Sequence, residues 1–268
     1  MSLVSSNVAS SSVVIPALDP GASYVSRLSA RSALYTELRL LLDDHGHPMK
    51  PEQYRALIVE KNCLARKSSS TRSKLWTELR TRYRLNSVDP LFKAFWAEWR
   101  RCQSDQERGL TAYVLFALND RLAADLGREW LFPLLRRAPA ELRVNEVRSF
   151  IFGKSRRGHP EIQNWSDKTT LAVAQKYCAS LRDFGLATGT VHKKSVRPAL
   201  YGSPVRLLIH ALRLAHLSSL EIVNASIFQL LAIDSSEVID ALGELNRVSA
   251  LRFRIQGDIV ELDLLEAA

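Results

Sequence analysis

Residues 89–99, which read DPLFKAFWAEW, indicate the fold most clearly. Asp89 is a good N-cap and Pro90 a good first helical residue, so this pair predicts the start of a helix. The aromatic side chains then fall at positions i, i+3, i+4 and i+7, which are Phe92, Phe95, Trp96 and Trp99. Because these positions share one side of a helix, we interpret the stripe as a core face rather than a base-stacking platform.

The helical period extends on both sides of this stretch. Gly and Pro number only 11 and 10 in 268 residues, which disfavours a β fold rich in these residues. Ser166 and Gly185 mark the start and end of one helix, as an N-cap and a left-handed C-cap. From the spacing of apolar residues we predict helices over residues 24–42, 51–64, 71–84, 111–126, 130–135, 140–152, 166–184, 204–217, 220–232 and 235–247.

Two segments break the helical period and predict β-hairpins. Residues 186–201 place Thr188 and Gly189 between short β-prone pieces, and residues 251–264 alternate apolar and polar side chains around a turn at 256–258. The second hairpin follows three predicted helices, which is the order of elements in a winged-helix module. The predicted fold class is therefore mostly α: a helical bundle with two winged-helix-like C-terminal modules that carry small β-hairpins.

The densest basic region lies between Lys61 and Arg84, where eight basic side chains stand against one acid, Glu78. One face of the predicted helix holds Leu75, Trp76, Leu79 and Tyr83, and the opposite face holds Ser73, Thr77, Arg80 and Arg84. Burial of the apolar face directs the basic stripe into solvent, and the Ser/Thr-rich helix start adds donors that suit phosphate. The candidate DNA-binding residues of this region are Arg66, Lys67, Ser70, Arg72, Lys74, Arg80 and Arg84. A solvated Arg-rich face without a ligand is the alternative interpretation.

A second basic group follows later in the chain. Arg156 and Arg157 lie in a predicted flexible loop at 153–164, from which they can reach a DNA backbone. Lys193 and Lys194 lie in the first predicted hairpin. The helix before that hairpin presents one stripe of Lys168, Gln175 and Arg182. This pairing resembles a DNA reader made of a helix and a wing, although an ordinary exposed loop and hairpin fit the sequence as well.

Composition and charge divide the chain into four predicted parts. These are a flexible tail at 1–20, an N-terminal helical DNA-binding domain at 21–138, a helical, winged module at 139–202 and an acidic winged-helix-like module at 203–268. Residues 218–268 hold three arginines against nine acids, a net charge of −6, which leaves +15 for residues 1–217. Because carboxylates on the third helix of the last module repel phosphate, we assign that module to structure or protein contact.

The cysteines and the hydropathy indicate the compartment. Cys63, Cys102 and Cys178 are widely spaced and form no CxxC or Cys/His cluster, so we predict reduced core thiols in a cytoplasmic protein. The most apolar stretches, residues 110–118 and 205–217, are shorter than the roughly 18–20 residues that span a bilayer. No membrane partner is expected.

Enzyme motifs fail on inspection. Residues 152–155 imitate the end of a phosphate-binding loop, but the first required glycine is replaced by Arg148. His45 and His47 are the closest pair of histidines and lack supporting ligands beyond Asp43 and Asp44. We therefore expect no catalytic residue, no metal site, no cofactor and no small-molecule substrate.

Several segments together resemble the BrxA family of BREX bacteriophage-defence systems. The first landmark comprises residues 24–30 (YVSRLSA), 62–72 (NCLARKSSSTR) and 80–83 (RTRY). The second begins with WSDK at 165–168 and ends with LRDFGL at 181–186. The order and spacing of both landmarks, which cover about residues 21–200, make the likeness specific.

The resemblance implies a mostly helical, non-catalytic protein that binds double-stranded DNA and acts with other BREX subunits in antiviral defence. Two other functions also fit the sequence: a protein-interaction scaffold within the BREX complex, and a winged-helix transcriptional regulator. RNA binding is a further alternative, because a basic helical bundle does not choose between A-form and B-form backbones.

Overall fold

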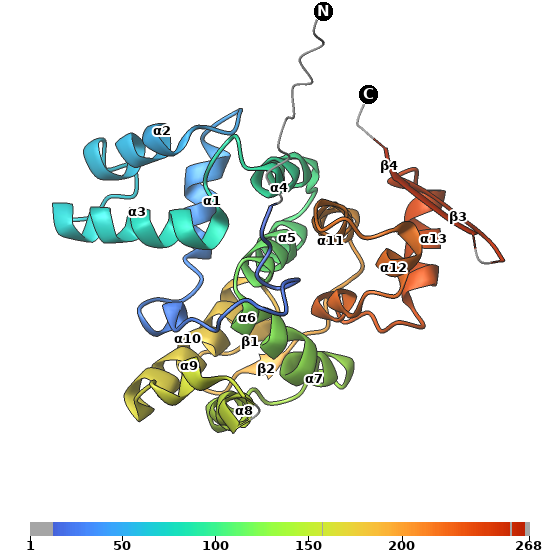
Figure 1. The fold of residues 1–268 in the computed structure, drawn as a ribbon. Coiled ribbons are helices and arrows are strands. Elements are labelled where there is room, and N and C mark those ends of the chain that lie inside the picture. Colours follow the sequence, from blue (N-terminus) through green and yellow to red (C-terminus); the bar gives the residue numbers. More distant parts are fainter. Residues whose placement is uncertain (1–12, 157, 258, 266–268) are drawn as a thin grey trace, which may run out of the picture.

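The aromatic stripe of residues 89–99 is buried in the computed structural model, which describes residues 13–156, 158–257 and 259–265 (Figure 1). The carboxylate of Asp89 accepts a hydrogen bond from the Phe92 N–H at 2.9 Å and so caps helix α4, Pro90–Arg101. Phe92, Phe95, Trp96 and Trp99 are each at most 7% exposed. The prediction of a core face is confirmed.

Helix α5, Asp105–Leu118, runs through the middle of the N-terminal half and is buried at every residue from Gly109 to Leu118. Around it lie α1 (Tyr35–Asp43), α2 (Pro51–Arg55), which continues as the π-helix η2 (Ala56–Glu60), and α3 (Ser69–Tyr83). The predicted helix over 24–42 is wrong in its first half, because Leu34 has a left-handed backbone (φ 59°) and the helix begins at Tyr35.

The middle of the chain folds into a run of helices and a small hairpin. Its helices are α6 (Arg121–Asp125), the π-helix η3 (Leu126–Leu131), α7 (Phe132–Arg136), α8 (Val144–Arg156), α9 (Pro160–Gln163) and α10 (Asp167–Asp183). Strands β1 (Ala187–Thr188) and β2 (Lys194–Ser195) pair antiparallel, as the first predicted hairpin requires. The predicted single helix over 111–126 is broken at Asn119, because the Asp120 carboxylate caps α6 by accepting from the Ala123 N–H at 3.2 Å.

The C-terminal part contains three helical pieces and the second predicted hairpin. Helix α11 (Gly202–Leu214) packs against α4 and α5, so its buried side chains join the same core. After it come α12 (Ser219–Val223), the 3-10 helix η4 (Ser226–Leu231) and α13 (Val238–Arg247). The predicted helix over 220–232 is therefore two helices, because Ala225 is extended. Strands β3 (Leu251–Gln256) and β4 (Ile259–Leu264) pair antiparallel with Leu251 opposite Leu264.

In the described part of the chain the protein is mostly helical, with two small two-stranded antiparallel sheets. The mostly α fold class is confirmed. The four predicted domain limits stay a prediction, since α11 from the last part packs directly against α4 and α5 from the second. Cys63 is exposed, which corrects its assignment to the core, whereas Cys102 and Cys178 are buried. Among the described residues no helix has the length and apolarity to cross a bilayer.

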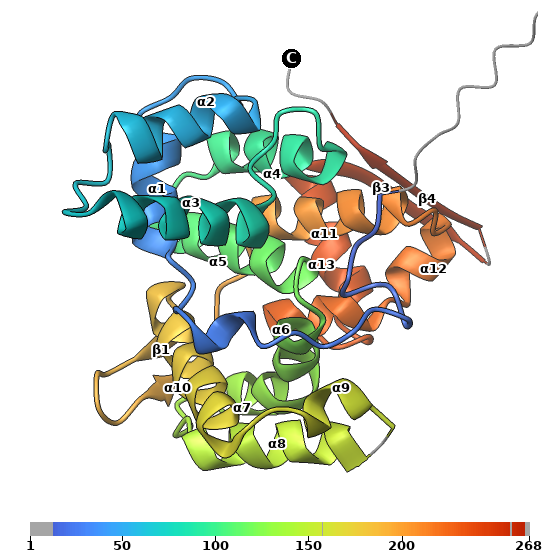
Figure 2. The ribbon, with the colours of Figure 1, turned by 60° about the vertical axis from the view of Figure 1, so that its left-hand side comes forward.

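An extended N-terminal segment crosses the surface of this body. Residues 1–12 of the predicted tail lie outside the described residues, but Ile15 is buried and the Ala17 N–H donates to the Leu118 carbonyl at 3.1 Å. The segment continues through the 3-10 helix η1 (Arg27–Ser29) to Leu34. Figure 2 shows it passing in front of α6, with α3 above η1 and α10 below it. We call residues 24–34 the strap.

Candidate nucleic-acid interface

Helix α3 has one buried and one exposed face, as its sequence predicts. Ser68 caps it, because the Ser68 hydroxyl accepts a hydrogen bond from the Thr71 N–H at 3.1 Å. Leu75, Leu79 and Tyr83 are at most 1% exposed, so the opposite side of the helix cannot turn inward. That side presents Ser70, Ser73, Lys74, Thr77 and Arg80 to solvent.

The cations on and beside α3 are largely free of the protein's own carboxylates. Within the described residues, no Asp or Glu oxygen lies within 4.0 Å of the charged groups of Lys61, Lys67, Arg72, Lys74 or Arg80. The Arg80 guanidinium instead lies over the ring of Trp76, 5.8 Å from its centroid, which restricts the side chain without neutralising it. This surface therefore carries positive charge that needs an external counterion.

Two of the predicted contact residues are held internally. Arg66 pairs with Glu37 at 2.7 Å while its side chain stays 42% exposed. Arg84 leaves the predicted stripe, because α3 ends at Tyr83 and Arg84 has a left-handed backbone with φ of 52°. Its guanidinium turns to Asp89 at 2.7 Å and to the side chain of Asn119, which leaves only 20% of the side chain exposed.

The predicted wing lies next to residues 140–142, which form an isolated β-bridge with it. Glu141 forms an antiparallel bridge with Lys194, the Leu142 N–H donates to the Lys193 carbonyl at 2.8 Å, and the Ser195 N–H donates to Ala140 at 2.7 Å. Residues 140–142, β2 and β1 thus lie side by side in that order. Lys194 is exposed, and Lys193 is partly buried with its ammonium on the Thr190 carbonyl at 2.7 Å.

Helix α10 carries the stripe that the sequence places beside this wing. Lys168, Gln175 and Arg182 are all exposed. Arg182 pairs with its neighbour Asp183 at 2.9 Å, whereas Lys168 has no carboxylate within 4.0 Å among the described residues. The exposed face of α10 and the hairpin therefore form a second basic surface.

The remaining predicted residues are not brought onto α3. Arg156 is exposed at the end of α8, which corrects its assignment to a flexible loop, and Arg157 lies outside the described residues. Helix α8 packs against α10 and α9, whereas α3 packs against η2, α2 and α5. The predicted site is thus divided between two surfaces, one on α3 and one around α8, α10 and the hairpin.

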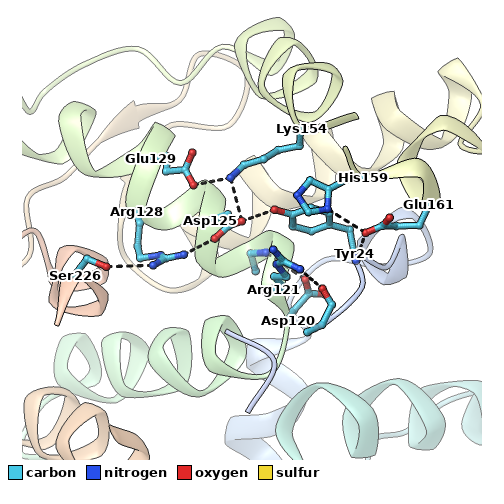
Figure 3. A network of polar contacts seen from close by, with 12 residues as sticks. Tyr24, Asp120, Arg121, Asp125, Arg128, Glu129, Lys154, His159, Glu161 and Ser226 are labelled. Carbon is cyan, nitrogen blue, oxygen red and sulfur yellow. Dashed lines mark hydrogen bonds and ion pairs between the residues drawn. The ribbon is translucent and has the colours of Figure 1, made fainter. Parts of the chain in front are cut away.

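A polar network that the sequence does not announce fastens the strap to the body (Figure 3). At its centre Asp125, which is 4% exposed, accepts hydrogen bonds from the Tyr24 hydroxyl at 2.5 Å and the Arg128 guanidinium at 2.5 Å. The Lys154 ammonium lies 3.1 Å from Asp125 and 2.6 Å from Glu129. Tyr24 and Asp125 are 101 residues apart, so no local pattern could have predicted the contact.

The hydrogen bonds and ion pairs of this network hold its groups in fixed protonation states. Burial and the hydrogen bond to Asp125 raise the pKa of Tyr24 well above its usual range, so its proton stays in place. Burial alone would raise the pKa of Asp125, but the hydrogen bonds from Tyr24 and Arg128 and the charge of Lys154 together lower it. An open pocket of about 410 Å³ beside the network contains Arg121 and Asp19 as well, so charges of both signs line it. In the described part of the chain no three potential metal ligands cluster.

One comparison with known proteins places most of the chain in a family. The family model for BrxA matches residues 22–211, which is more than half of the chain. The match covers the strap, α3, the polar network and both short strands β1 and β2. A search of curated proteins finds no match.

Proposed function

Because the chain belongs to the BrxA family and so is a component of BREX phage-defence systems, we propose that it binds double-stranded DNA as a non-catalytic accessory subunit. The grip is on the phosphate backbone. Few side chains suited to bidentate base recognition occupy the exposed faces, so the expected sequence preference is weak.

One observation carries the proposal: α3 and the loop before it hold exposed cations that pair with no carboxylate among the described residues. Lys67 precedes the Ser/Thr-rich start of α3, Arg72 and Lys74 lie in its first two turns, and Arg80 lies farther along, where the buried face of the helix directs it outward. A phosphate that meets them releases condensed counterions from DNA, which supplies free energy without any base contact. Arg84 is omitted from this grip, because Asp89 already neutralises it.

A second surface supports DNA as the partner. Residues 126–195 follow the order of a winged-helix module: the helices η3 and α7, the segment at 140–142, α8, α10 and the β1–β2 hairpin. The segment at 140–142 lies against β2, as the first and last strands of such modules do. We assign α10 as its DNA-facing helix and residues 189–193 as its wing, with Arg156 and Lys194 at the margin.

The proposal includes no chemical step on DNA. The titratable side chains in Figure 3 neutralise one another. Lys154 lies between the carboxylates of Asp125 and Glu129, and the Tyr24 hydroxyl donates its hydrogen bond to Asp125. Methylation or cleavage of DNA is left to other subunits of the defence system.

The acidic module offers a contact for those subunits. Its exposed apolar side chains are Leu220, Ile239, Val248, Ile255 and Ile259. Exposed apolar residues beside carboxylates fit a protein partner better than a phosphate backbone. Residues 218–265 are therefore proposed to contact another BREX subunit.

A fluorescence-anisotropy titration with a labelled duplex tests the DNA grip. If about five phosphates are neutralised, log K falls against log salt with a slope near −4 to −5, with affinity in the micromolar range. The variant Lys74→Glu/Arg80→Glu is expected to weaken binding at least about 25-fold, roughly 5-fold or more for each lost contact. Competition with single strands and duplex RNA measures the preference among nucleic acids.

The matched control reverses two exposed cations on another helix. Lys93 and Arg100 lie seven residues apart on α4, are both exposed, and have no carboxylate within 4.0 Å in the described chain. Lys93→Glu/Arg100→Glu changes the net charge by the same amount. It is expected to bind within about 3-fold of the parent, because only the screened, long-range effect of the lost charge remains. Equal losses in both variants, or affinity that is flat with salt, contradict the α3 grip.

A further inference from the structure

An open hollow of about 520 Å³ lies between the two basic surfaces. Its floor is the strap from Tyr24 to Ala30, one wall is α3 at Glu78, and the other wall is formed by Glu161 and Trp165 just before α10. Figures 1 and 2 both place η1 between α3 and the α9–α10 region. A linear polymer that contacted α3 and α10 together would pass over this floor.

The floor presents hydrogen-bond donors that the protein does not use. Arg27 is exposed, and within the described residues its guanidinium has neither a carboxylate within 4.0 Å nor a hydrogen bond. The hydroxyls of Ser26 and Ser29 and the indole N–H of Trp165 likewise lack partners in the described structure. Cationic and neutral donors without internal acceptors suit phosphate and sugar oxygens.

The acids in the lining are already occupied. Glu78 pairs with the buried Arg82 at 3.0 Å. Glu161 accepts the Tyr24 N–H at 3.1 Å and lies 3.5 Å from the Nδ1 atom of His159. Outside them, Lys74 is one helical turn from Glu78 on α3. Lys168 and the exposed Asp167 lie in the first turn of α10, just after Trp165. Arg27, Lys74 and Lys168 are therefore the cations of the hollow and its rim that pair with no carboxylate among the described residues.

The strap also fixes how α3 and α10 sit relative to each other. The Ala33 N–H donates to the Ser180 hydroxyl of α10 at 2.8 Å, and the Ala33 carbonyl accepts from the Tyr83 hydroxyl of α3 at 2.7 Å. Both bonds are buried, and the Arg82 guanidinium adds a bond to the Arg27 carbonyl at 3.2 Å. The backbone of one residue, Ala33, thus connects the two helices and fixes their spacing at this point.

We propose that the strap hollow, with Arg27, Ser26, Ser29 and Trp165 as its contacts, binds the sugar-phosphate backbone of the duplex that α3 grips. This inference rests on the proposed DNA binding and extends it, because it makes α3 and α10 two ends of one continuous footprint. The strap then has two roles, as a spacer between the helices and as a phosphate contact between them.

Salt-dependent titration of Arg27→Gln tests the contact. Loss of one phosphate contact is expected to weaken duplex binding about 5-fold at 0.15 M salt and to make the log–log salt slope shallower by about 0.9. The control Arg100→Gln removes a charge that is also exposed, on α4, and is expected to match the parent. Circular dichroism and the melting temperature of each variant verify that both are folded.

Site-directed crosslinking gives a second readout that does not depend on affinity. Ala30 is exposed and lines the hollow, so Ala30→Cys in a Cys63→Ser background, modified with a photoactivated aryl azide, is expected to attach to a bound duplex. Ser235→Cys, exposed in the acidic module, is the control and is expected to give no adduct.

The outcomes separate the two proposals. If Lys74→Glu/Arg80→Glu abolishes binding while Arg27→Gln behaves as the parent and Ala30→Cys gives no adduct, the strap hollow is not a DNA contact and the α3 grip stands. A parent protein that fails to bind any duplex overturns both. A shallower salt slope for Arg27→Gln, together with an adduct at Ala30→Cys and none at Ser235→Cys, supports the continuous footprint.

Discussion

Two neighbouring buried carboxylates illustrate how single residues set the behaviour of this fold. Asp125 receives three donors, and its pKa is lowered even though burial acts in the opposite direction. Asp120, which is 6% exposed, has a raised pKa because burial outweighs the backbone hydrogen bonds and the charge of Arg27. The same residue type five positions apart thus favours the charged form at one site and the neutral form at the other.

The variant Asp125→Asn is expected to destabilise the protein at pH 7 by about 3 kcal/mol, because it leaves Lys154 and Arg128 without their shared carboxylate. Since folding lowers the pKa of Asp125, its contribution is present above the unfolded value of about 3.9 and is lost as pH falls through the lower folded value. Urea denaturation of parent and variant between pH 3 and pH 7 measures whether the difference between their free energies of unfolding shrinks as the pH falls.

Asp120→Asn is the matched control at the neighbouring site. A raised folded pKa means that the ionised group costs stability at neutral pH, and asparagine still serves as the N-cap of α6. This variant is expected to be at least as stable as the parent at pH 7. A large loss in both variants would show that the polar character of the region, and not the Asp125 network, is what matters.

At the scale of elements, the spacing of apolar residues predicted the helix faces and hairpins correctly wherever tertiary contacts did not change the local backbone. The two faces of α3 and both hairpins follow from local patterns, because apolar spacing and turn residues act over a few positions. The breaks at Leu34, Asn119 and Ala225 escaped prediction, since the apolar period continues through each of them. What interrupts the helix there is a left-handed or extended backbone, or a side-chain cap.

The β1–β2 hairpin depends on Gly189, which has a φ of 85°. A Cβ atom at this position would also collide with the carbonyl oxygen of His192. Gly189→Ala is therefore expected to cost about 1–3 kcal/mol of local strain and to disorder the wing. If the wing contacts DNA, affinity falls about as much as in Lys193→Gln/Lys194→Gln. The control Gly153→Ala, at a helical position with open space, is expected to leave binding unchanged.

At the scale of the whole molecule, a buried ion pair joins the acidic module to the N-terminal core. Glu98 is fully buried on α4 and accepts from Arg206 of α11 at 3.1 Å through both carboxylate oxygens. Arg206 also donates to the carbonyls of Ala250 and Leu265, at the two ends of the second hairpin. One guanidinium therefore connects three parts of the chain.

Arg206→Met is expected to destabilise the protein by about 3–5 kcal/mol, because Glu98 would be left buried with only Arg101 and His210 nearby. The double variant Glu98→Leu/Arg206→Met is expected to recover most of that loss, since neither charge is then stranded. Urea denaturation of the four proteins gives the coupling energy. An Arg206→Met variant as stable as the parent would mean that the module is held by apolar packing alone.

The candidate site shows where prediction from sequence ends. Local spacing placed Arg80 correctly on the exposed face of α3, and Lys67 and Lys74, which charge density singled out, are exposed as well. Arg84 was misplaced, since its partner Asp89 is reached only after the chain turns left-handed. The strap hollow has no local signature at all: its walls come from residues 24–30, Glu78 and Trp165.

The hydrogen bond between Ala33 and Ser180 spans 147 residues, and this has a consequence for biosynthesis. At about 5–20 residues per second, a ribosome needs roughly 7–30 s to make the chain between them. During that interval η1, with its buried Leu28, has no α10 to pack against. The nascent polypeptide is therefore most prone to aggregation, and most dependent on a chaperone, until α10 leaves the exit tunnel.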